Sequence, residues 1–318
     1  MVSSQPKSNI SNVARPAVAI FGFNRPEHLR KCLESLFRNQ NSTEHKYFLF
    51  IDGPRTSEDV NSVEAVCEVG NFFKSKLDIA IVESPYNRGL SESLISGISE
   101  VLTISDSIIV IEDDLELHPN FLNFMSKYLS KYKNDDEVAS IQGFTYPIFP
   151  NGIECFFLKG ADCWGWGTWR DRWALLQLNS QVMVDQLKSR GQARSFDLDG
   201  AFPYTRMLER QARGEVDSWA IRWHASIYLL GKLSLYPPHT LVRNNGFDGS
   251  GTHVSSRDQE NFQNFSEFSY QAPVEIRESK SARHRLKLFL RKKYGTYPVF
   301  HPKGIVSKIQ RRIIPGLR

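Results

Sequence analysis

Three adjacent carboxylates, Glu112, Asp113 and Asp114, directly follow the apolar run Ile108–Ile111. A short run of such residues is typical of a strand buried on both faces of a parallel sheet. Acids after such a strand lie at its carboxyl end, where open α/β sheets bind ligands. Because adjacent negative charges repel one another, they need a positive partner, and a divalent cation carrying a phosphorylated ligand would supply one. An acidic cap before a helix is the alternative, but it explains one acid rather than three.

Other polar residues follow the preceding predicted strands. Arg25 comes after the apolar segment 17–21, Asp52 after 47–51 and Arg88 after 79–82. Each also has a structural interpretation. Arg25 could be a surface arginine, Asp52 is followed by Gly53 and Pro54 as in a turn, and Arg88 precedes a predicted helix.

The elements that must position these residues alternate between strands and helices. We expect strands at 17–21, 47–51, 79–82 and 108–111, separated by helices at about 26–40, 57–74 and 90–104. This alternation predicts a parallel sheet covered by helices. Beyond it we expect the following elements: a helix at 119–133, a strand at 140–142, a Gly- and aromatic-rich segment at 143–173, helices at 180–190, 200–213 and 217–230, a strand at 233–236, and a polar loop at 243–253.

Composition bounds the class of protein. The 318 residues are 41% hydrophobic and 24% charged, which is ordinary for one large or two small globular domains. From Lys280 onward there are 12 Lys or Arg and no Asp or Glu, so the net charge of +5 becomes −7 for residues 1–279. A mildly acidic body argues against a nucleic-acid surface. The four cysteines form no CxxC pair, and so few cysteines in a large chain favour a reducing, cytoplasmic location.

The two ends of the chain differ from the body. Residues 1–15 are polar, lack the apolar core of a signal peptide, and are expected to be disordered. No apolar run approaches the roughly 18–20 residues needed to span a bilayer. The tail carries RHRLKLFLRKKY and IVSKIQRRIIPGLR, which we interpret as amphipathic segments for the inner, anionic face of a membrane. A solvated basic extension is the alternative.

The segment VIEDDLELHPNFLNFM, from Val110 to Met125, resembles the metal-binding segment of GT-A glycosyltransferases of the N-acetylglucosaminyltransferase I type. The resemblance covers roughly residues 16–255. It implies an α/β, Rossmann-like GT-A domain, with a mostly parallel central sheet flanked by helices. Residues 256–318 would then be a basic C-terminal extension that could associate with a membrane.

The resemblance also assigns roles to the donor-site residues. Asp114 would be the protein ligand of Mn²⁺ (or Mg²⁺) that bridges the two phosphates of a nucleotide-sugar. Asp113 would contact the ribose, and Glu112 would lie near the transferred sugar. Asp52 matches the carboxylate that accepts the N3–H of uracil, which implies a UDP-sugar donor. Arg25 and Arg88 would lie beside this nucleotide.

Four further residues matter for the sugar and the acceptor. Asp217, in VDSWAIRW, resembles the family's catalytic base, which takes the acceptor hydroxyl's proton in an inverting transfer. A helix-terminal acid is its alternative. Trp164 or Trp166 would line the sugar pocket, although most tryptophans pack in the core. His253 follows the Gly-rich loop 246–252, which could close over the diphosphate, or it could be a surface histidine.

Together these features predict a metal-dependent inverting glycosyltransferase. It would move a sugar, GlcNAc-like by resemblance, from a UDP-sugar to a hydroxyl of a glycan or lipid-linked glycan. A sugar-nucleotide nucleotidyltransferase is one alternative, but FGFNRPEH after the first strand lacks the glycine- and lysine-rich loop of that class. A non-catalytic sugar- or nucleotide-binding module is the other, and such a module would not need Asp217.

Overall fold

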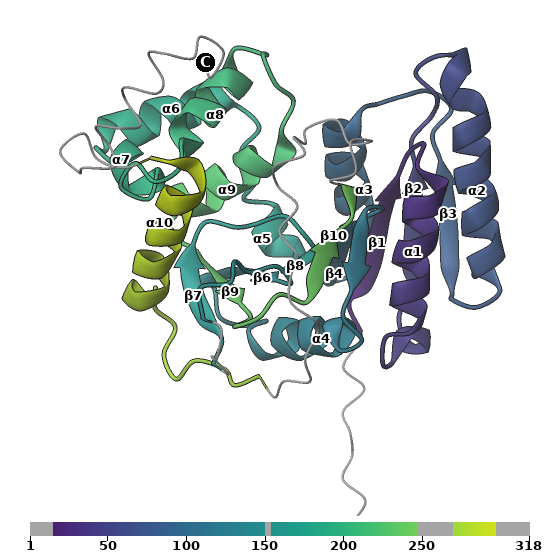
Figure 1. The fold of residues 1–318 in the computed structure, drawn as a ribbon, viewed down its shortest axis with the longest axis horizontal. Helices are drawn as coiled ribbons and strands as arrows, with labels where there is room; N and C mark the ends of the chain where they lie inside the picture. Colours follow the sequence, from purple (N-terminus) through teal and green to yellow (C-terminus); the bar gives the residue numbers. More distant parts are fainter. Residues whose placement is uncertain (1–14, 150–153, 247–269, 297–318) are drawn as a thin grey trace, which may run out of the picture.

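The computed structural model describes residues 15–149, 154–246 and 270–296. Figure 1 shows a twisted sheet with α1, α2 and α3 around one end and a group of helices, α6 to α10, at the other. The strands are β1 (Ala17–Gly22), β2 (Tyr47–Ile51), β3 (Ile79–Glu83), β4 (Ser107–Glu112), β5 (Leu115–Leu117), β6 (Val138–Gln142), β7 (Phe156–Lys159), β8 (Trp166–Trp169), β9 (Leu233–Tyr236) and β10 (Val242–Asn244). The α-helices are α1 (Pro26–Phe37), α2 (Val60–Lys74), α3 (Leu90–Ile104), α4 (Phe121–Lys131), α5 (Arg170–Trp173), α6 (Ser180–Ser189), α7 (Ala193–Phe196), α8 (Tyr204–Ala212), α9 (Trp219–Leu229) and α10 (Lys280–Tyr294), and short 3₁₀ turns cover Ser42–Glu44 and Ser57–Asp59.

The main sheet has eight strands in the order β3-β2-β1-β4-β8-β6-β9-β7. The first four are parallel, as predicted from their alternation with helices. Strand β8 runs antiparallel to both β4 and β6, and β7 runs antiparallel to β9. The expected α/β architecture is confirmed, with an antiparallel part that the sequence did not indicate.

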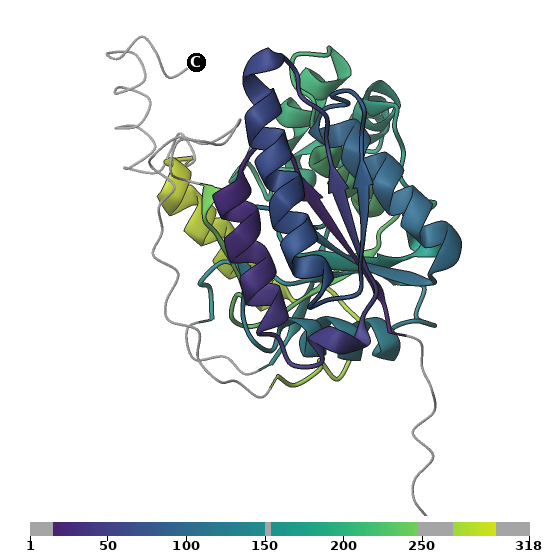
Figure 2. The same ribbon diagram turned by 90° about the vertical axis from the view of Figure 1, so that its right-hand side faces the viewer.

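Apolar side chains alternate between the two faces of the sheet. In β1, Val18 and Ile20 belong to the core under α1, α2 and α4, whereas Ala19 and Phe21 belong to the core under α3 and α9. This alternation follows from the two-residue period of a strand. Figure 2 shows the resulting three layers, with α1 and α2 side by side on one face.

Three predicted helices are shorter in the structure. The expected helix at 119–133 begins at Phe121, after Pro119 and Asn120. The one expected at 200–213 begins at Tyr204, because Leu198 and Asp199 have positive φ and the chain turns there. The one expected at 217–230 begins at Trp219, where the Ser218 hydroxyl caps it by accepting from the Ile221 N–H at 3.4 Å.

Helix α10 contains the first basic tail segment, RHRLKLFLRKKY, whereas the second, IVSKIQRRIIPGLR, lies outside the described residues. Its apolar residues Ala282, Leu286 and Leu290 recur every fourth position and pack in a core with Phe156 and Tyr236. This face is therefore covered by the protein and is not available for insertion into a bilayer. Exposed basic side chains remain on the outer face: Lys280, Arg285 and Lys292. In the described part of the chain, no helix combines the length and apolarity that crossing a membrane requires.

Candidate active site

The carboxyl ends of β1, β2 and β4 lie at the same edge of the sheet. Phe21 pairs with Glu112, and Gly22 pairs with Ile51. The residues that follow these strands therefore meet there, as expected from the parallel arrangement.

Arg25 is the cation of this edge. It precedes Pro26, the first residue of α1, and its Nη2 donates to Asp113 and, at 3.2 Å, to Asp114. The Arg25 side chain is 20% exposed, and the Asp113 side chain only 4%. Burial disfavours the Arg25 charge, but the two carboxylates outweigh it and raise the pKa of Arg25. The structure thus brings Arg25 next to the acids, as expected from residues that follow neighbouring parallel strands.

The acid triplet carries more negative charge than Arg25 neutralises. Burial, followed by repulsion from Asp114 and Asp113, raises the pKa of Glu112 to about 8. Burial also raises the pKa of Asp113 to about 6, although Arg25 opposes this shift. Around neutral pH, full ionisation of the triplet is therefore unfavourable without a further positive charge.

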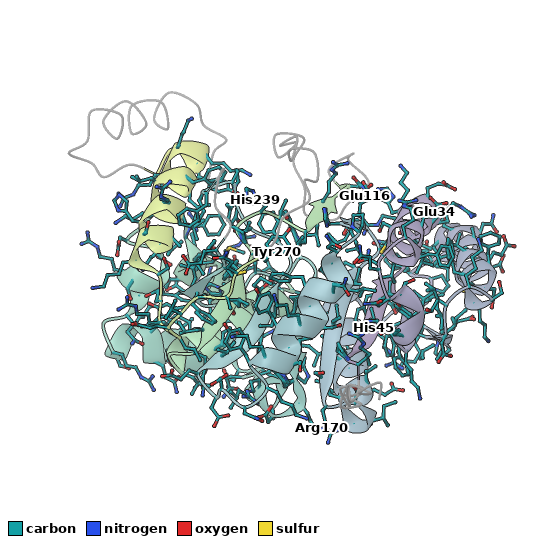
Figure 3. All side chains as sticks on the ribbon, turned by 90° about the horizontal axis from the view of Figure 1, so that it is seen from below. Glu34, His45, Glu116, Arg170, His239 and Tyr270 are labelled. Atoms are coloured by element: carbon teal, nitrogen blue, oxygen red, sulfur yellow. The ribbon has the colours of Figure 1, made fainter. Side chains whose placement is uncertain are left out.

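A distant segment reaches Asp114. Strand β10 pairs with β5, the strand that follows Asp114, and the Asn245 N–H donates to the Asp114 carbonyl at 2.8 Å. Arg243 of β10 is ion-paired with Glu116 of β5 at 3.4 Å, and Glu116 is labelled in Figure 3. A Cβ added to Gly246 would lie 2.5 Å from Asp114 Oδ2, so a side chain at this position would displace the Asp114 carboxylate. The sequence contained this glycine within the predicted loop but gave no sign of its contact with Asp114.

Asp52 is buried and holds the loop after β3. Its carboxylate accepts from Asn87 Nδ2 at 3.0 Å and from the N–H groups of Arg88 at 2.8 Å and Gly89 at 2.9 Å. It also accepts from the Gly53 N–H at 3.0 Å. A carboxylate has about four lone-pair positions, so these donors occupy its capacity. In this structure Asp52 therefore has the turn-forming role that was the alternative to nucleotide binding.

The Arg88 side chain is exposed on that loop. Its Nε donates to Ser84 Oγ at 3.2 Å, and its guanidinium lies 5.6 Å from the ring centre of Tyr86. Both contacts are within the loop. The loop therefore places Arg88 at the surface near the edge that carries Asp52.

The two candidate tryptophans differ in burial. Trp166 is fully buried, and its ring centre lies 5.5 Å from Trp219 and 5.8 Å from Trp223. This side chain packs in the core and does not line a sugar pocket in this structure, so the core-packing alternative fits it. Trp164 is only partly buried and meets the ring of Phe144 at 4.7 Å.

Asp217 lies just before α9, which the buried tryptophans anchor to the sheet. Its side chain is 65% exposed and ion-paired with Arg222 Nη2 at 3.3 Å. Arg222 also donates to Ser91 Oγ of α3, directly after the loop that contains Arg88. The Asp217 carboxylate is thereby held on the side of the molecule where the Asp52 loop leads into α3. His253 lies outside the described residues, as does most of the loop 246–252.

Asp162 is an acid that the sequence-based prediction missed. It precedes Cys163 and Trp164, in the Gly- and aromatic-rich segment that had been singled out. Burial raises its pKa to about 6, opposed by the N–H groups of Cys163 and Trp164. The sequence feature that could have identified Asp162 as a candidate site residue is its position as an acid inside an aromatic-rich segment.

Comparison with known protein families finds a match for the segment that forms this site. Residues 17–178 match the model described as glycosyl transferase family 2, which is slightly more than half of the chain. No curated protein sequence matches.

Solved structures are similar at low identity. A mannosyltransferase from Pyrobaculum calidifontis in complex with GDP-Man and Mn²⁺ is 11% identical, with a TM-score of 0.40, over 68% of this chain and 70% of that one. TarS 1-349 of S. aureus is 10% identical, with a TM-score of 0.38, over 72% and 60% of the two chains. GalNAc-T7 with UDP, GalNAc and Mn²⁺ is 11% identical, with a TM-score of 0.45, over 93% and 54%. The chain thus spans less than two thirds of the latter two structures.

The family match covers all four parallel strands, the Arg25 and Asp52 loops and the acid triplet. The mostly parallel sheet flanked by helices is the GT-A fold expected of such a chain. The chain therefore belongs to glycosyl transferase family 2, and it is a glycosyltransferase.

Proposed function

We propose that this enzyme transfers a sugar from a UDP-sugar to a hydroxyl of a glycan, with inversion and with the help of Mn²⁺ or Mg²⁺. The observation that carries the proposal is the acid triplet, in which Asp113 is buried and whose negative charge Arg25 balances in part. Family membership favours this activity over a nucleotidyltransferase or a non-catalytic binding module. A GlcNAc-like sugar rests on the resemblance to the N-acetylglucosaminyltransferase I type.

Asp114 suits a metal site that the protein would share with the bound donor. The described ranges contain no group of three or more His, Cys, Asp or Glu side chains placed to hold a metal ion by themselves. Asp114 would therefore be the protein ligand, and the donor diphosphate would complete the coordination. The close approach of Gly246 leaves the Asp114 carboxylate free of side-chain crowding on that side. When bound, the metal would stabilise the negative charge of the departing nucleoside diphosphate.

The chain's own groups would orient the donor. Asp113 would contact the ribose, and Glu112 would lie near the transferred sugar. Arg25 is already bonded to Asp113 and Asp114, so it would fix the direction of both carboxylates. Asp52 would set the uracil site through the loop whose N–H groups it holds.

Asp217 would take the proton of the acceptor hydroxyl. General bases of this kind contribute about 10²–10⁴-fold to the rate. Arg222 holds the Asp217 carboxylate from one side, and the exposed remainder is open to an acceptor. Trp164 would border the sugar, and His253 would close the site with its loop.

The acceptor would be a glycan or a lipid-linked glycan at the cytoplasmic face of a membrane. Because the apolar face of α10 is buried, any attraction to the membrane would come from the exposed Lys280, Arg285 and Lys292. Basic residues near an anionic surface contribute about 1 kcal/mol each at low ionic strength. Co-sedimentation with phosphatidylglycerol vesicles, but not with phosphatidylcholine vesicles, would support this partner.

The deciding experiment is a thermal-shift panel of UDP-, GDP-, CMP- and dTDP-sugars with and without Mn²⁺. A true donor stabilises the protein by mass action, and the shift should require both UDP-sugar and metal. Asp114→Asn should abolish this shift, whereas Asp185→Asn, an exposed acid of α6, should retain it. Stabilisation by a CMP-sugar without metal would overturn the proposal.

A turnover assay tests the base. Asp217→Asn should keep the metal-dependent thermal shift and lose about 10² or more of the transfer rate. Full turnover in this variant would show that Asp217 is not the base.

A further inference from the structure

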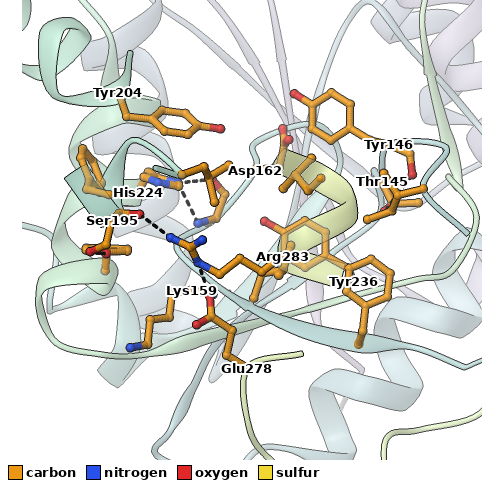
Figure 4. Close-up of a pocket in the computed structure, with 18 residues that line it drawn as sticks. Thr145, Tyr146, Lys159, Asp162, Ser195, Tyr204, His224, Tyr236, Glu278 and Arg283 are labelled. Atoms are coloured by element: carbon orange, nitrogen blue, oxygen red, sulfur yellow. Dashed lines mark hydrogen bonds and ion pairs between the residues drawn. The ribbon is translucent and has the colours of Figure 1, made fainter. Parts of the chain in front are cut away.

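A cavity of about 40 Å³ lies between the β7–β9 end of the sheet and the helices α8, α9 and α10. Figure 4 shows that the hydroxyls of Tyr146, Tyr204 and Tyr236 and the carboxylate of Asp162 face the same interior space. The wall beside them is apolar and includes Phe156, whose ring stacks on Tyr236 at 5.7 Å. An aromatic wall around a cluster of hydroxyls and one carboxylate suits a polar ligand with an apolar face.

The charges around the cavity disfavour an anionic ligand. Arg283 lies at the rim, but it is already paired with Asp199 at 3.1 Å and donates to the Ser195 carbonyl at 2.9 Å. Burial lowers the pKa of His224 to about 4, so this imidazole is neutral at physiological pH. Asp162 is the acid at the centre. Lys159, the other cation of the lining, is exposed and lies on the side of Glu278, away from the tyrosine hydroxyls (Figure 4). The part of the lining around Asp162 therefore offers hydrogen bonds to a neutral group.

The tyrosine hydroxyls are available for such hydrogen bonds. In the described part of the chain, no side-chain hydrogen bond is made by the hydroxyls of Tyr146 and Tyr204, and neither oxygen is fully buried. Asp162 Oδ1 accepts from the Cys163 N–H at 2.8 Å, which leaves lone pairs of the carboxylate toward the cavity. Phenol hydroxyls can donate and accept, as can the hydroxyls of a sugar.

Asp162 and α9 connect the cavity to the proposed reaction centre. Cys163 directly follows Asp162 of the cavity, and burial together with the charges of both Asp162 and Glu112 raises its pKa, so Cys163 is close enough to both acids to feel their charge. Helix α9 begins two residues after Asp217 and carries His224 of the cavity lining, so one helix supports both the proposed base and the cavity wall.

We propose that this cavity binds a substituent of a neutral sugar unit in the acceptor glycan, held by Asp162, Tyr146 and Tyr204. The volume admits about three water molecules, so it accepts a hydroxymethyl or N-acetyl group rather than a whole ring. This inference rests on the proposed glycosyl transfer, and it makes the cavity part of the site that binds the acceptor. The nucleotide would bind elsewhere, at the edge carrying Asp114, because the tyrosine hydroxyls and Asp162 offer no positive charge to a diphosphate.

Saturation-transfer NMR with methyl glycosides tests this assignment. The probes are the methyl glycosides of glucose, galactose, mannose, rhamnose, GlcNAc and GalNAc at millimolar concentration, without nucleotide or metal. At least one should receive saturation from the wild-type chain. Tyr204→Phe and Asp162→Asn should each weaken that binding about tenfold, the usual effect of losing a hydrogen bond to a polar or charged group.

The matched control is Tyr132→Phe, whose buried hydroxyl has no hydrogen-bond partner in the described structure and lies in another core. It should bind the probes like the wild type, and near-ultraviolet circular dichroism should show all variants folded. Absence of transfer to every probe, or equal transfer in all variants, would overturn the inference.

The thermal-shift panel with UDP-sugar and Mn²⁺ on the same samples separates the two proposals. Nucleotide-sugar binding without glycoside binding would refute the cavity assignment alone. Glycoside binding without nucleotide-sugar binding would refute the proposed donor.

Discussion

Replacing Arg25 with methionine removes the cation between Asp113 and Asp114 while keeping an apolar side chain of similar length. At an effective dielectric constant of about 20, a charge pair at 3.2 Å attracts by roughly 5 kcal/mol before desolvation is subtracted. Removing one partner of a buried pair costs about 3–5 kcal/mol. Because the Arg25 side chain is 20% exposed, we expect Arg25→Met to lose an amount of unfolding free energy at the lower end of this range, about 3 kcal/mol, at about pH 8.

The loss of stability in Arg25→Met relative to the wild type, which we call the deficit, should depend on pH. Burial raises the pKa of Asp113 to about 6 and that of Glu112 to about 8 even though Arg25 lowers both, so both would rise further in Arg25→Met. When the folded-state pKa of an acid exceeds its unfolded value, stability is complete below the unfolded pKa and is lost as pH rises through the folded one. The free energy of unfolding of Arg25→Met should therefore approach that of the wild type near about pH 5 and become lower than it toward about pH 8.

Urea unfolding of both proteins across this range gives the measurement, and Arg55→Met is the control. Arg55 pairs with Asp59 at 2.9 Å, but its side chain is 55% exposed. The hydrogen bond from Arg55 lowers the pKa of Asp59 to about 2, so this acid stays ionised from about pH 5 to 8 and the control should show no trend. A deficit of Arg25→Met that does not change with pH, or one matched by Arg55→Met, would refute the reasoning.

Three further outcomes are expected. Gly246→Ala should weaken Mn²⁺-dependent UDP-sugar binding about tenfold or more by calorimetric titration, because its Cβ would meet Asp114. Gly22→Ala, whose Cβ would have only ordinary contacts of 3.8 Å, should bind normally. Asp52→Asn should cost about 2–3 kcal/mol in urea unfolding, since its amide N–H₂ would oppose backbone donors, and a loss near zero would contradict this. Trp223→Ala should cost about 3–5 kcal/mol, because the side chain is fully buried among other tryptophans; a shift typical of a surface residue would contradict it.

The first half of the fold could be predicted because its signals are local. Runs such as 47–51 and 108–111 are buried on both faces, and the structure places β2 and β4 within one residue of them. Strand β8 gave no such signal. Its sequence, WGTW, contains only four residues and a glycine, and it becomes a strand because β4 and β6 pair with it.

The candidate site shows the same division. The meeting of Arg25 with Asp113 and Asp114 follows from one rule, that parallel strands end at one edge of a sheet. The contact of Gly246 with Asp114 depends on the pairing of two three-residue strands far apart in the sequence, and no local pattern specifies that. Trp166, which we expected with Trp164 to line the sugar pocket, packs in the core in this structure, because a tryptophan between glycines fits both roles until its neighbours are known.

The pairing of β5 with β10 also sets the earliest time at which the proposed donor site can be complete during synthesis. Asp114 leaves the ribosome roughly 130 residues before Gly246, which at 5–20 residues per second is about 7–26 s. A nascent chain that ends within this interval can complete the four parallel strands and still lack the glycine that lies against the acid. Nucleotide-sugar binding should therefore appear late in translation, well after the parallel half of the sheet has formed.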